Sequence, residues 1–160
     1  MFSFFKKKGG GELAAVADGL CIPLEEVKDP AFSGKALGEG IAIVPENGEI
    51  VAPCDGKLSM LTPTLHAFGM ECPDGLQLMV HIGIDTVELN GEGFEKLVEA
   101  GSQVSRGQPV IRFDPDFMKK KGIDTTTMLI LLNHSDFKIN ALHHGKRMKK
   151  GADTAIEYAR

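Results

Sequence analysis

The stretch Thr64-Leu-His-Ala-Phe-Gly-Met-Glu-Cys-Pro-Asp-Gly-Leu-Gln-Leu-Met-Val-His81 contains two short apolar segments joined by the turn Pro73-Asp-Gly75. Proline presets φ and glycine tolerates positive φ, so these residues favour a tight reversal of the chain. The segment after the turn, residues 76–81, alternates in polarity as a strand with one buried face does. We therefore expect a β-hairpin centred on residues 73–75.

Short β-rich segments continue on both sides of this hairpin. They include residues 40–44, residues 109–113 and the apolar run 127–132, and turn residues separate them. Glycine makes up 19 of the 160 residues, a larger share than the average of about 7%. A high glycine content is expected for a chain that turns often. Only residues 93–100 and 114–122 fit short helices. The sequence predicts an all-β fold, an antiparallel β-sandwich or barrel-like structure with short peripheral helical turns.

The chain divides into a short tail and one domain. Residues 1–11 hold three phenylalanines, three lysines and three consecutive glycines, which predicts a flexible N-terminal tail before a domain over residues 12–160. Residues 1–8 could contact an anionic membrane surface weakly. The tail lacks the apolar region of a signal peptide, and no apolar run approaches the ~20 residues of a membrane span. We therefore expect a cytoplasmic protein.

The composition argues against several function classes. Lys+Arg number 18 against 22 Asp+Glu, a net charge of −4, whereas nucleic-acid-binding proteins usually carry a basic surface. Aromatic residues make up 6% of the chain, which disfavours a surface on which bases stack. The three cysteines, Cys21, Cys54 and Cys72, show no CxxC spacing. We therefore expect no nucleic-acid partner, no disulfide framework and no zinc knuckle.

Two of the five histidines, His66 and His81, lie on the two arms of the predicted hairpin. When the hairpin is drawn through the turn at residues 73–75, His66 is directly opposite His81. Directly opposed residues of antiparallel strands have Cβ atoms about 5 Å apart. The two imidazoles are therefore expected to be neighbours.

Adjacent imidazoles support several chemistries, and the hairpin alone leaves them open. They could bind a metal with a further ligand such as Glu71 or Asp85, or one could act as a base in hydrolysis. Alternatively, one could accept a phosphoryl group while the other donates a hydrogen bond to the phosphate. A structural pair hydrogen-bonded to Thr64 and Asp85 is the simplest interpretation of the two histidines by themselves.

A longer stretch around His81 is more specific. The sequence Val80-His-Ile-Gly-Ile-Asp-Thr-Val-Glu-Leu-Asn-Gly-Glu-Gly-Phe94 closely resembles the signature of the glucose-family IIA domain of the bacterial phosphoenolpyruvate:sugar phosphotransferase system. The resemblance extends in the same order to further segments and covers essentially the whole chain from Glu12: residues 32–43, 51–56, 64–71 and 101–108. It implies an antiparallel β-sandwich, in agreement with the strand pattern.

The resemblance also implies residue roles. His81 is the phosphorylated nucleophile, His66 stabilises the phosphate, Thr64 hydrogen-bonds in the site, and Asp85 is the acidic residue of the signature. In the family, the phosphoryl group comes from the carrier protein HPr and leaves to a IIB domain, and sugar is phosphorylated during uptake through IIC. Family members also regulate permeases and kinases according to their phosphorylation state. A neutral imidazole is a competent nucleophile, because its unperturbed pKa is about 6.5.

Apolar residues near the histidines are candidates for docking HPr and IIB. They are Phe32, Met79 and Val87. The implied chemistry requires no cofactor, although zinc could bridge His66 and His81 at a partner interface. The sequence has no IIB-type or IIC-type segment, so we expect a stand-alone carrier subunit, with a fragment of a larger chain as the alternative.

Two alternative functions use the same pair of histidines. A zinc-dependent hydrolase is one, because His81-x-x-x-Asp85 matches an HxxxD element of β-rich zinc peptidases. Those enzymes also need an HxH pair, and this sequence has none. The other is a regulatory binding module without catalysis that uses the His66/His81 surface.

Overall fold

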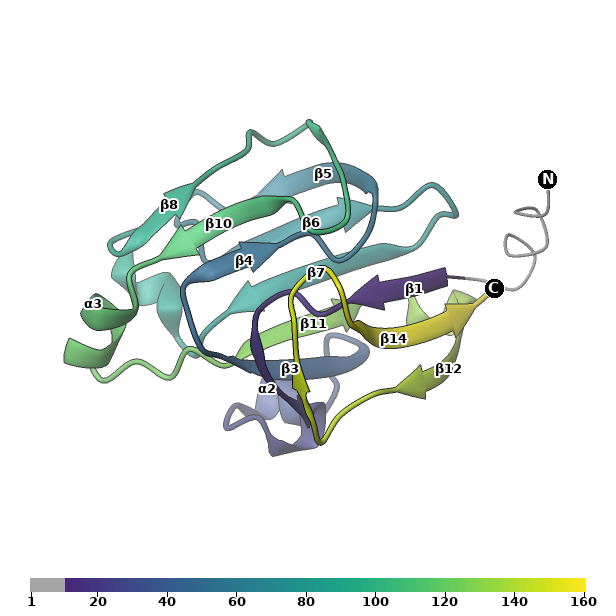
Figure 1. The fold of residues 1–160 in the computed structure, drawn as a ribbon, viewed down its shortest axis with the longest axis horizontal. Coiled ribbons are helices and arrows are strands. Elements are labelled where there is room, and N and C mark those ends of the chain that lie inside the picture. Colours follow the sequence, from purple (N-terminus) through teal and green to yellow (C-terminus); the bar gives the residue numbers. More distant parts are fainter. Residues whose placement is uncertain (1–10) are drawn as a thin grey trace.

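The computed structural model describes residues 11–160, which form one large and two small antiparallel β-sheets (Figure 1). The large sheet has eight strands in the order β13-β2-β3-β11-β7-β6-β5-β9. Their bounds are β2 (Gly19–Pro23), β3 (Glu39–Pro45), β5 (Gly56–Leu61), β6 (Ala67–Glu71), β7 (Gln77–Ile82), β9 (Gln103–Val104), β11 (Thr127–Leu131) and β13 (Arg147–Met148). Strands β6 and β7 are the arms of the predicted hairpin.

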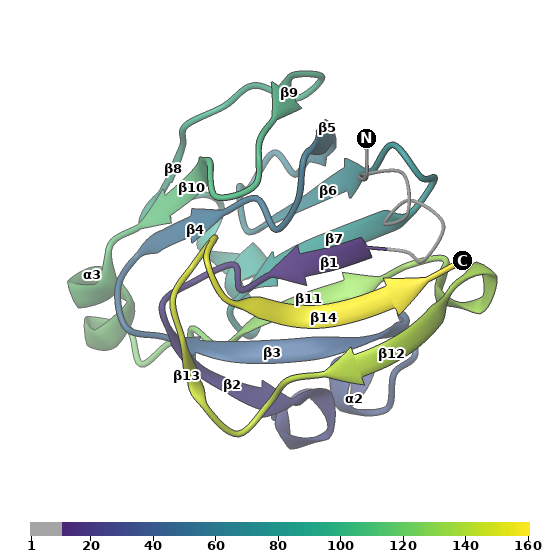
Figure 2. The same ribbon diagram turned by 45° about the vertical axis from the view of Figure 1, so that its right-hand side comes forward.

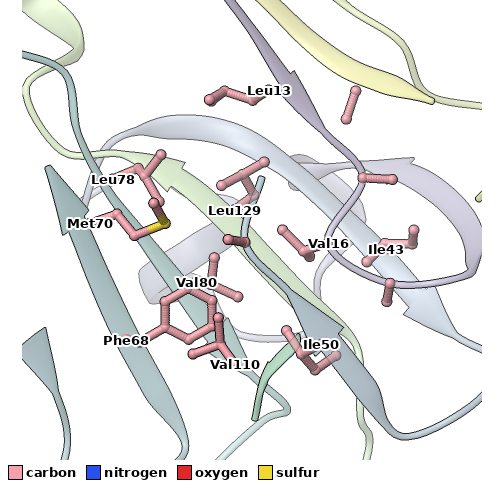
Figure 3. Packing of buried hydrophobic residues seen from close by; sticks show 14 of the residues in the cluster. Leu13, Val16, Ile43, Ile50, Phe68, Met70, Leu78, Val80, Val110 and Leu129 are labelled. Carbon is pink, nitrogen blue, oxygen red and sulfur yellow. The ribbon is translucent and has the colours of Figure 1, made fainter. Parts of the chain in front are cut away.

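The two small sheets cover one face of the large sheet (Figure 2). Their strands are β1 (Gly11–Ala14), β14 (Thr154–Ala159) and β12 (Lys138–Leu142) in one, and β4 (Glu49–Val51), β10 (Pro109–Phe113) and β8 (Phe94–Lys96) in the other. Side chains from both layers form one apolar core, in which Leu13, Ile50 and Val110 meet Phe68 and Leu129 (Figure 3). The predicted β-sandwich is confirmed.

A second, smaller core lies on the opposite face of the large sheet. There η1 (Leu24–Glu26) and α2 (Pro30–Ser33) place Leu24, Val27 and Phe32 against Ala42, Met128 and Ile130. Asp29 caps α2 by accepting a hydrogen bond from the Ala31 amide at 3.0 Å. The remaining short helices are η2 (Thr86–Leu89), α3 (Pro115–Lys120) and η3 (His134–Asp136). No helix within residues 11–160 is long and apolar enough to cross a membrane.

The structure differs from the sequence prediction at one of the two expected helices. The helix expected over residues 93–100 is wrong, because Phe94 to Lys96 form β8 and pair with β10. The β10 ladder supplies hydrogen-bond partners for the β8 backbone, and Phe94 and Val98 pack against the main core. The turn of helix expected within residues 114–122 is present as α3. The predicted tail lies outside the described residues except for Gly11, which begins β1.

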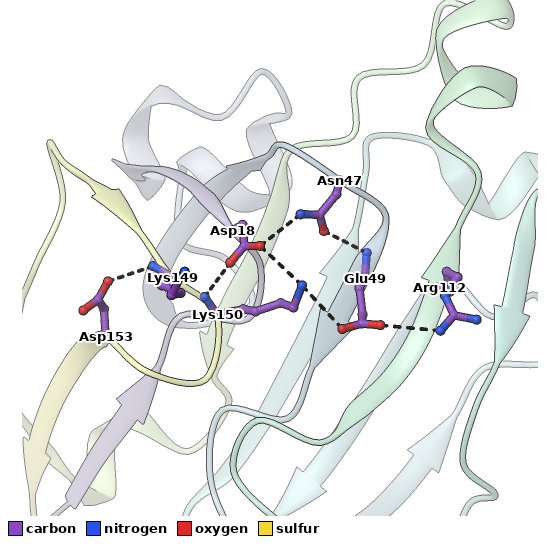
Figure 4. Close-up of polar contacts among 7 residues, drawn as sticks. All are labelled: Asp18, Asn47, Glu49, Arg112, Lys149, Lys150 and Asp153. Atoms are coloured by element: carbon purple, nitrogen blue, oxygen red, sulfur yellow. Dashed lines mark hydrogen bonds and ion pairs between the residues drawn. The ribbon is translucent and has the colours of Figure 1, made fainter.

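A polar network joins several turns at one end of the sandwich (Figure 4). The carboxylate of Asp18 accepts hydrogen bonds from the Lys150 backbone amide at 2.9 Å and from the Asn47 side chain at 3.0 Å. The ammonium group of Lys150 lies 3.3 Å from Asp18 and 3.4 Å from Glu49, which also pairs with Arg112. Asp18 therefore connects the β1–β2, β3–β4 and β13–β14 turns.

Candidate functional site

Alternation along β7 divides its side chains between the two faces of the large sheet. Leu78, Val80 and Ile82 are buried in the main core, whereas Met79 and His81 are half-buried and face the other way. There the Phe32 ring of α2 packs against the His81 imidazole, with ring centroids 4.8 Å apart. The outer face of the sheet, beside the small second core, is therefore the candidate site.

The hairpin brings His66 and His81 together by a different register from the predicted one. Ala67, not His66, is opposite His81, because Glu71 pairs with Gln77 across a longer turn than expected. His66 comes just before β6, where its carbonyl accepts a hydrogen bond from the Ile82 amide at 2.7 Å. The rings nevertheless meet edge to face, with centroids 5.0 Å apart. The prediction that the imidazoles are neighbours is correct, and its one-residue pairing is wrong.

The chain after β7 holds one nitrogen of His81. The Nδ1 atom lies 3.1 Å from the carbonyl oxygen of Gly83, and because a carbonyl can only accept, this nitrogen carries the proton. Gly83 has a φ of 81°, and its amide donates to the Thr126 carbonyl at 3.0 Å. The buried Thr86 hydroxyl donates to the Ile82 carbonyl. This turn therefore fixes the Gly83 carbonyl and leaves Nε2 of a neutral His81 unprotonated.

Two threonines hold His66. Its Nδ1 atom lies 2.6 Å from the Thr64 hydroxyl and 3.4 Å from the Thr62 hydroxyl. Thr62 also bonds to both backbone groups of Ala67, at 3.1 and 3.2 Å. The left-handed backbone of Leu65, with a φ of 61°, turns the chain between Thr64 and His66. His66 is 9% exposed, and its Nε2 atom is the ring nitrogen free of these contacts.

Burial keeps both imidazoles neutral near neutral pH. Removal from water lowers the pKa of His66 and, with the neighbouring His66 as a second cause, lowers the pKa of His81 to about 4. The Gly83 carbonyl and the charges of Asp29 and Asp85 act in the opposite direction on His81, but they are outweighed. Each ring can therefore offer a lone pair or an N–H group according to its tautomer.

The other predicted site residues lie at different distances from this pair. Thr64 contacts His66 directly, whereas Asp85 is exposed at the start of η2 and acts on His81 through its charge. Among the docking candidates, Phe32 is 4% exposed, Met79 is half-buried and Val87 is 48% exposed. Their docking role stays a prediction.

Several positioning residues were not predicted. Thr62 and Thr86 each contact a residue four positions away, and Thr86 lies within the signature around His81, so these two had a local sequence signal. Asp29 acts on His81 from a separate segment, and no local pattern indicates it. Within residues 11–160, no cluster of three or more His, Cys, Asp or Glu side chains is arranged to hold a metal ion.

Comparisons with known proteins identify the family of this chain. Residues 11–137 match the family described as phosphoenolpyruvate-dependent sugar phosphotransferase system, EIIA 1. The glucoside-specific EIICBA component of Staphylococcus carnosus is 45% identical over 87% of this chain and 20% of its own length. The glucose-specific EIICBA component of the same organism is 41% identical over 89% of this chain and 21% of its own length. The chain thus spans about a fifth of the length of these curated relatives.

A solved structure shares the whole fold. Glucose permease IIA from Mycoplasma capricolum is 33% identical, with a TM-score of 0.86 over 92% of this chain and 94% of that one. The sandwich fold of this chain is thus the fold of a solved glucose permease IIA. The zinc-dependent hydrolase interpretation has no support in these comparisons. The chain belongs to the EIIA 1 family of the phosphoenolpyruvate-dependent sugar phosphotransferase system.

Proposed function

We propose that this domain is a cytoplasmic histidine phosphocarrier, in which His81 accepts a phosphoryl group from phosphorylated HPr and passes it to a IIB domain. The hydrogen bond from His81 Nδ1 to the Gly83 carbonyl carries this proposal, because it leaves the lone pair on Nε2. The lowered pKa of His81 keeps that nitrogen unprotonated at neutral pH. Nε2 attacks phosphorus as the phosphorus–nitrogen bond of the donor breaks.

His66 is positioned to stabilise the transferred group. When the Thr64 hydroxyl donates to Nδ1 of His66, the proton of a neutral His66 is on Nε2. That N–H group can then donate to a phosphate oxygen on His81, whose ring centroid is 5.0 Å away. Phosphoryl transfer depends mainly on positioning and on charge stabilisation, and this pair can supply both.

The surroundings of His81 fit a basic protein partner. Asp29 and Asp85 both act on His81 through their negative charges. The exposed Val87 lies in η2, two residues after Asp85. A donor protein with cationic side chains and an apolar contact surface would complement this rim. The names of the similar Staphylococcus carnosus proteins support glucose or a glucoside as the sugar of the pathway.

The experiment is reconstitution with phosphoenolpyruvate, enzyme I and HPr, followed by intact-mass and peptide mass spectrometry. We expect one acid-labile phosphate on His81, absent from His81→Ala. His66→Ala should still accept phosphate from HPr but transfer it to IIB more slowly. Phosphate on another residue, or none in a folded wild-type protein, would overturn the proposal.

A further inference from the structure

Two cysteines that are distant in sequence have adjacent sulfur atoms. The Sγ atoms of Cys54 and Cys72 are 3.0 Å apart, although the residues are 18 positions apart in the chain. Cys54 lies in the connection from β4 to β5, which crosses from a small sheet to the large one, and Cys72 directly follows β6. Both are free thiols, and one donates a hydrogen bond to the other.

The backbone on both sides of this pair is anchored. The Pro53 carbonyl next to Cys54 accepts a hydrogen bond from the Ala14 amide at 2.8 Å. The Cys72 amide donates to the Leu76 carbonyl at 2.9 Å. A disulfide has a sulfur–sulfur distance of about 2.05 Å, so each sulfur needs to move by only about half an ångström. Small side-chain rotations can provide this movement without a change of fold.

We propose that Cys54 and Cys72 form a reversible dithiol–disulfide pair that a peroxide oxidises. Cys54 is half-buried and Cys72 is 5% exposed, so the peroxide reaches Cys54 first. The Cys54 thiol releases its proton, and the thiolate attacks one peroxide oxygen. The O–O bond breaks to give sulfenic acid and hydroxide, and the hydroxide takes up the released proton to form one water. The Cys72 sulfur then attacks the sulfenic sulfur and releases a second water. In total, two thiols lose two electrons and two protons, and the peroxide is reduced to two waters.

The surroundings of the pair determine how fast this reaction proceeds. The hydrogen bond with Cys72, burial and the charges of Cys72, Asp74 and Asp55 raise the pKa of the Cys54 thiol. Because the thiolate is the reactive form, oxidation is slow at neutral pH and becomes faster as the pH rises. The pair is therefore a slow responder to sustained oxidising conditions.

The disulfide should stabilise the fold and leave the histidine site intact. Closing a loop of this length raises the melting temperature by about 5–10 °C in a domain of this size. Cys72 lies in the turn that joins β6 to β7. His66 precedes the start of β6 and His81 is near the end of β7, so both histidines lie at the other end of the hairpin from Cys72. Phosphoryl acceptance by His81 is therefore expected to be unchanged, so this inference stands or falls separately from the proposed function.

The test treats the full chain with hydrogen peroxide at pH 8, alkylates the remaining thiols under denaturing conditions and maps the peptides without reduction. We expect an intramolecular Cys54–Cys72 linkage, alkylated Cys21, and a higher melting temperature that a reductant reverses. Cys21, 1% exposed in β2, is the internal control, because burial shields its thiol from the peroxide, whereas Cys54 is half-buried. Cys21→Ala should still form the linkage, whereas Cys54→Ala should lose both the linkage and the thermal shift.

Two results would overturn the inference. One is alkylation of all three cysteines in the treated wild-type protein. The other is a sulfinic or sulfonic acid on Cys54 in place of the linkage. Both are read from the wild-type chain, so the conclusion does not depend on how well the variants fold.

Discussion

The imidazole rings of His66 and His81 meet edge to face with centroids 5.0 Å apart, although the two residues are not opposite each other in the β6–β7 ladder. Ala67 occupies the position opposite His81, and His66 reaches the same place from just outside the strand. The left-handed backbone of Leu65 makes this approach possible. The pair is thus formed by His81 near the end of β7 and by His66 in the turn that precedes β6.

The first prediction concerns Gly83, whose carbonyl holds the Nδ1 proton of His81. Gly83→Ala would place a Cβ atom 2.5 Å from the Thr86 methyl carbon and 3.1 Å from the Asp124 carbonyl oxygen, at a φ of 81°. We expect a loss of about 2–4 kcal/mol in the free energy of unfolding and slower phosphorylation of His81. Chemical denaturation and the rate of phosphate transfer from HPr measure the two effects.

A matched control for this change is Gly122→Ala. Gly122 has a φ of 70°, but an added Cβ atom would meet no atom within 4 Å. It should therefore cost only the backbone strain, about 1 kcal/mol, and leave phosphorylation unchanged. Equal effects of the two substitutions would contradict a positioning role for the Gly83 carbonyl.

The second prediction concerns the hydroxyl that holds His66. Thr64→Val removes the 2.6 Å contact with Nδ1 while keeping the shape of the side chain. We expect His81 still to accept phosphate and onward transfer to IIB to slow about 5- to 10-fold, the rate equivalent of one hydrogen bond. Thr64→Ser retains the hydroxyl and should stay within about twofold of wild type. Rapid-quench measurement of phosphate transfer to IIB distinguishes these outcomes.

The third prediction is a pH dependence of stability. The pKa of His81 is about 4 in the folded protein and about 6.5 in the unfolded chain, so the unfolded state binds more protons between these values. The contribution of His81 to stability is therefore present above about pH 6.5 and is lost as the pH falls towards 4. Urea denaturation from pH 4 to 8 should show a shallower decrease for His81→Gln than for wild type. Parallel curves would show that His81 is not buried in neutral form.

The fourth prediction concerns the network around Asp18 (Figure 4). The hydrogen bonds from the Lys150 amide and from Asn47 are the main causes that lower the pKa of Asp18. Asp18→Asn should reduce the free energy of unfolding by about 1–2 kcal/mol at pH 7. Because a depressed carboxyl pKa stabilises the fold above about pH 3.8, the difference should shrink as the pH falls through the folded pKa.

A carboxylate with fewer partners provides the comparison for Asp18. The carboxylate of Asp153 accepts one backbone hydrogen bond, from the Lys149 amide at 2.7 Å, and the residue lies in an exposed turn. Asp153→Asn should cost less than Asp18→Asn at pH 7. The two variants are compared by guanidinium denaturation at pH 7 and pH 3, and a larger loss in Asp153→Asn would show that the network does not stabilise the turns.

Local sequence patterns determined much of this protein. The alternation in β7, the turn at residues 73–75 and the signature around His81 predicted the hairpin, the histidine pair and the family. The local sequence is enough to predict the hairpin, because side-chain alternation and turn preferences depend on only a few neighbouring residues. For the same reason, residues 93–100 were wrongly expected to form a helix: pairing with β10 lies outside any local window.

Only the tertiary structure decided how the site and its surroundings are held. It buried Phe32 beside the His81 imidazole and brought the Sγ atom of Cys54 to 3.0 Å from that of Cys72. These contacts join segments that meet only when the layers pack and their apolar faces leave water. Burial then lowered the pKa of His81, a property of the folded environment that the identity of the residue alone does not set.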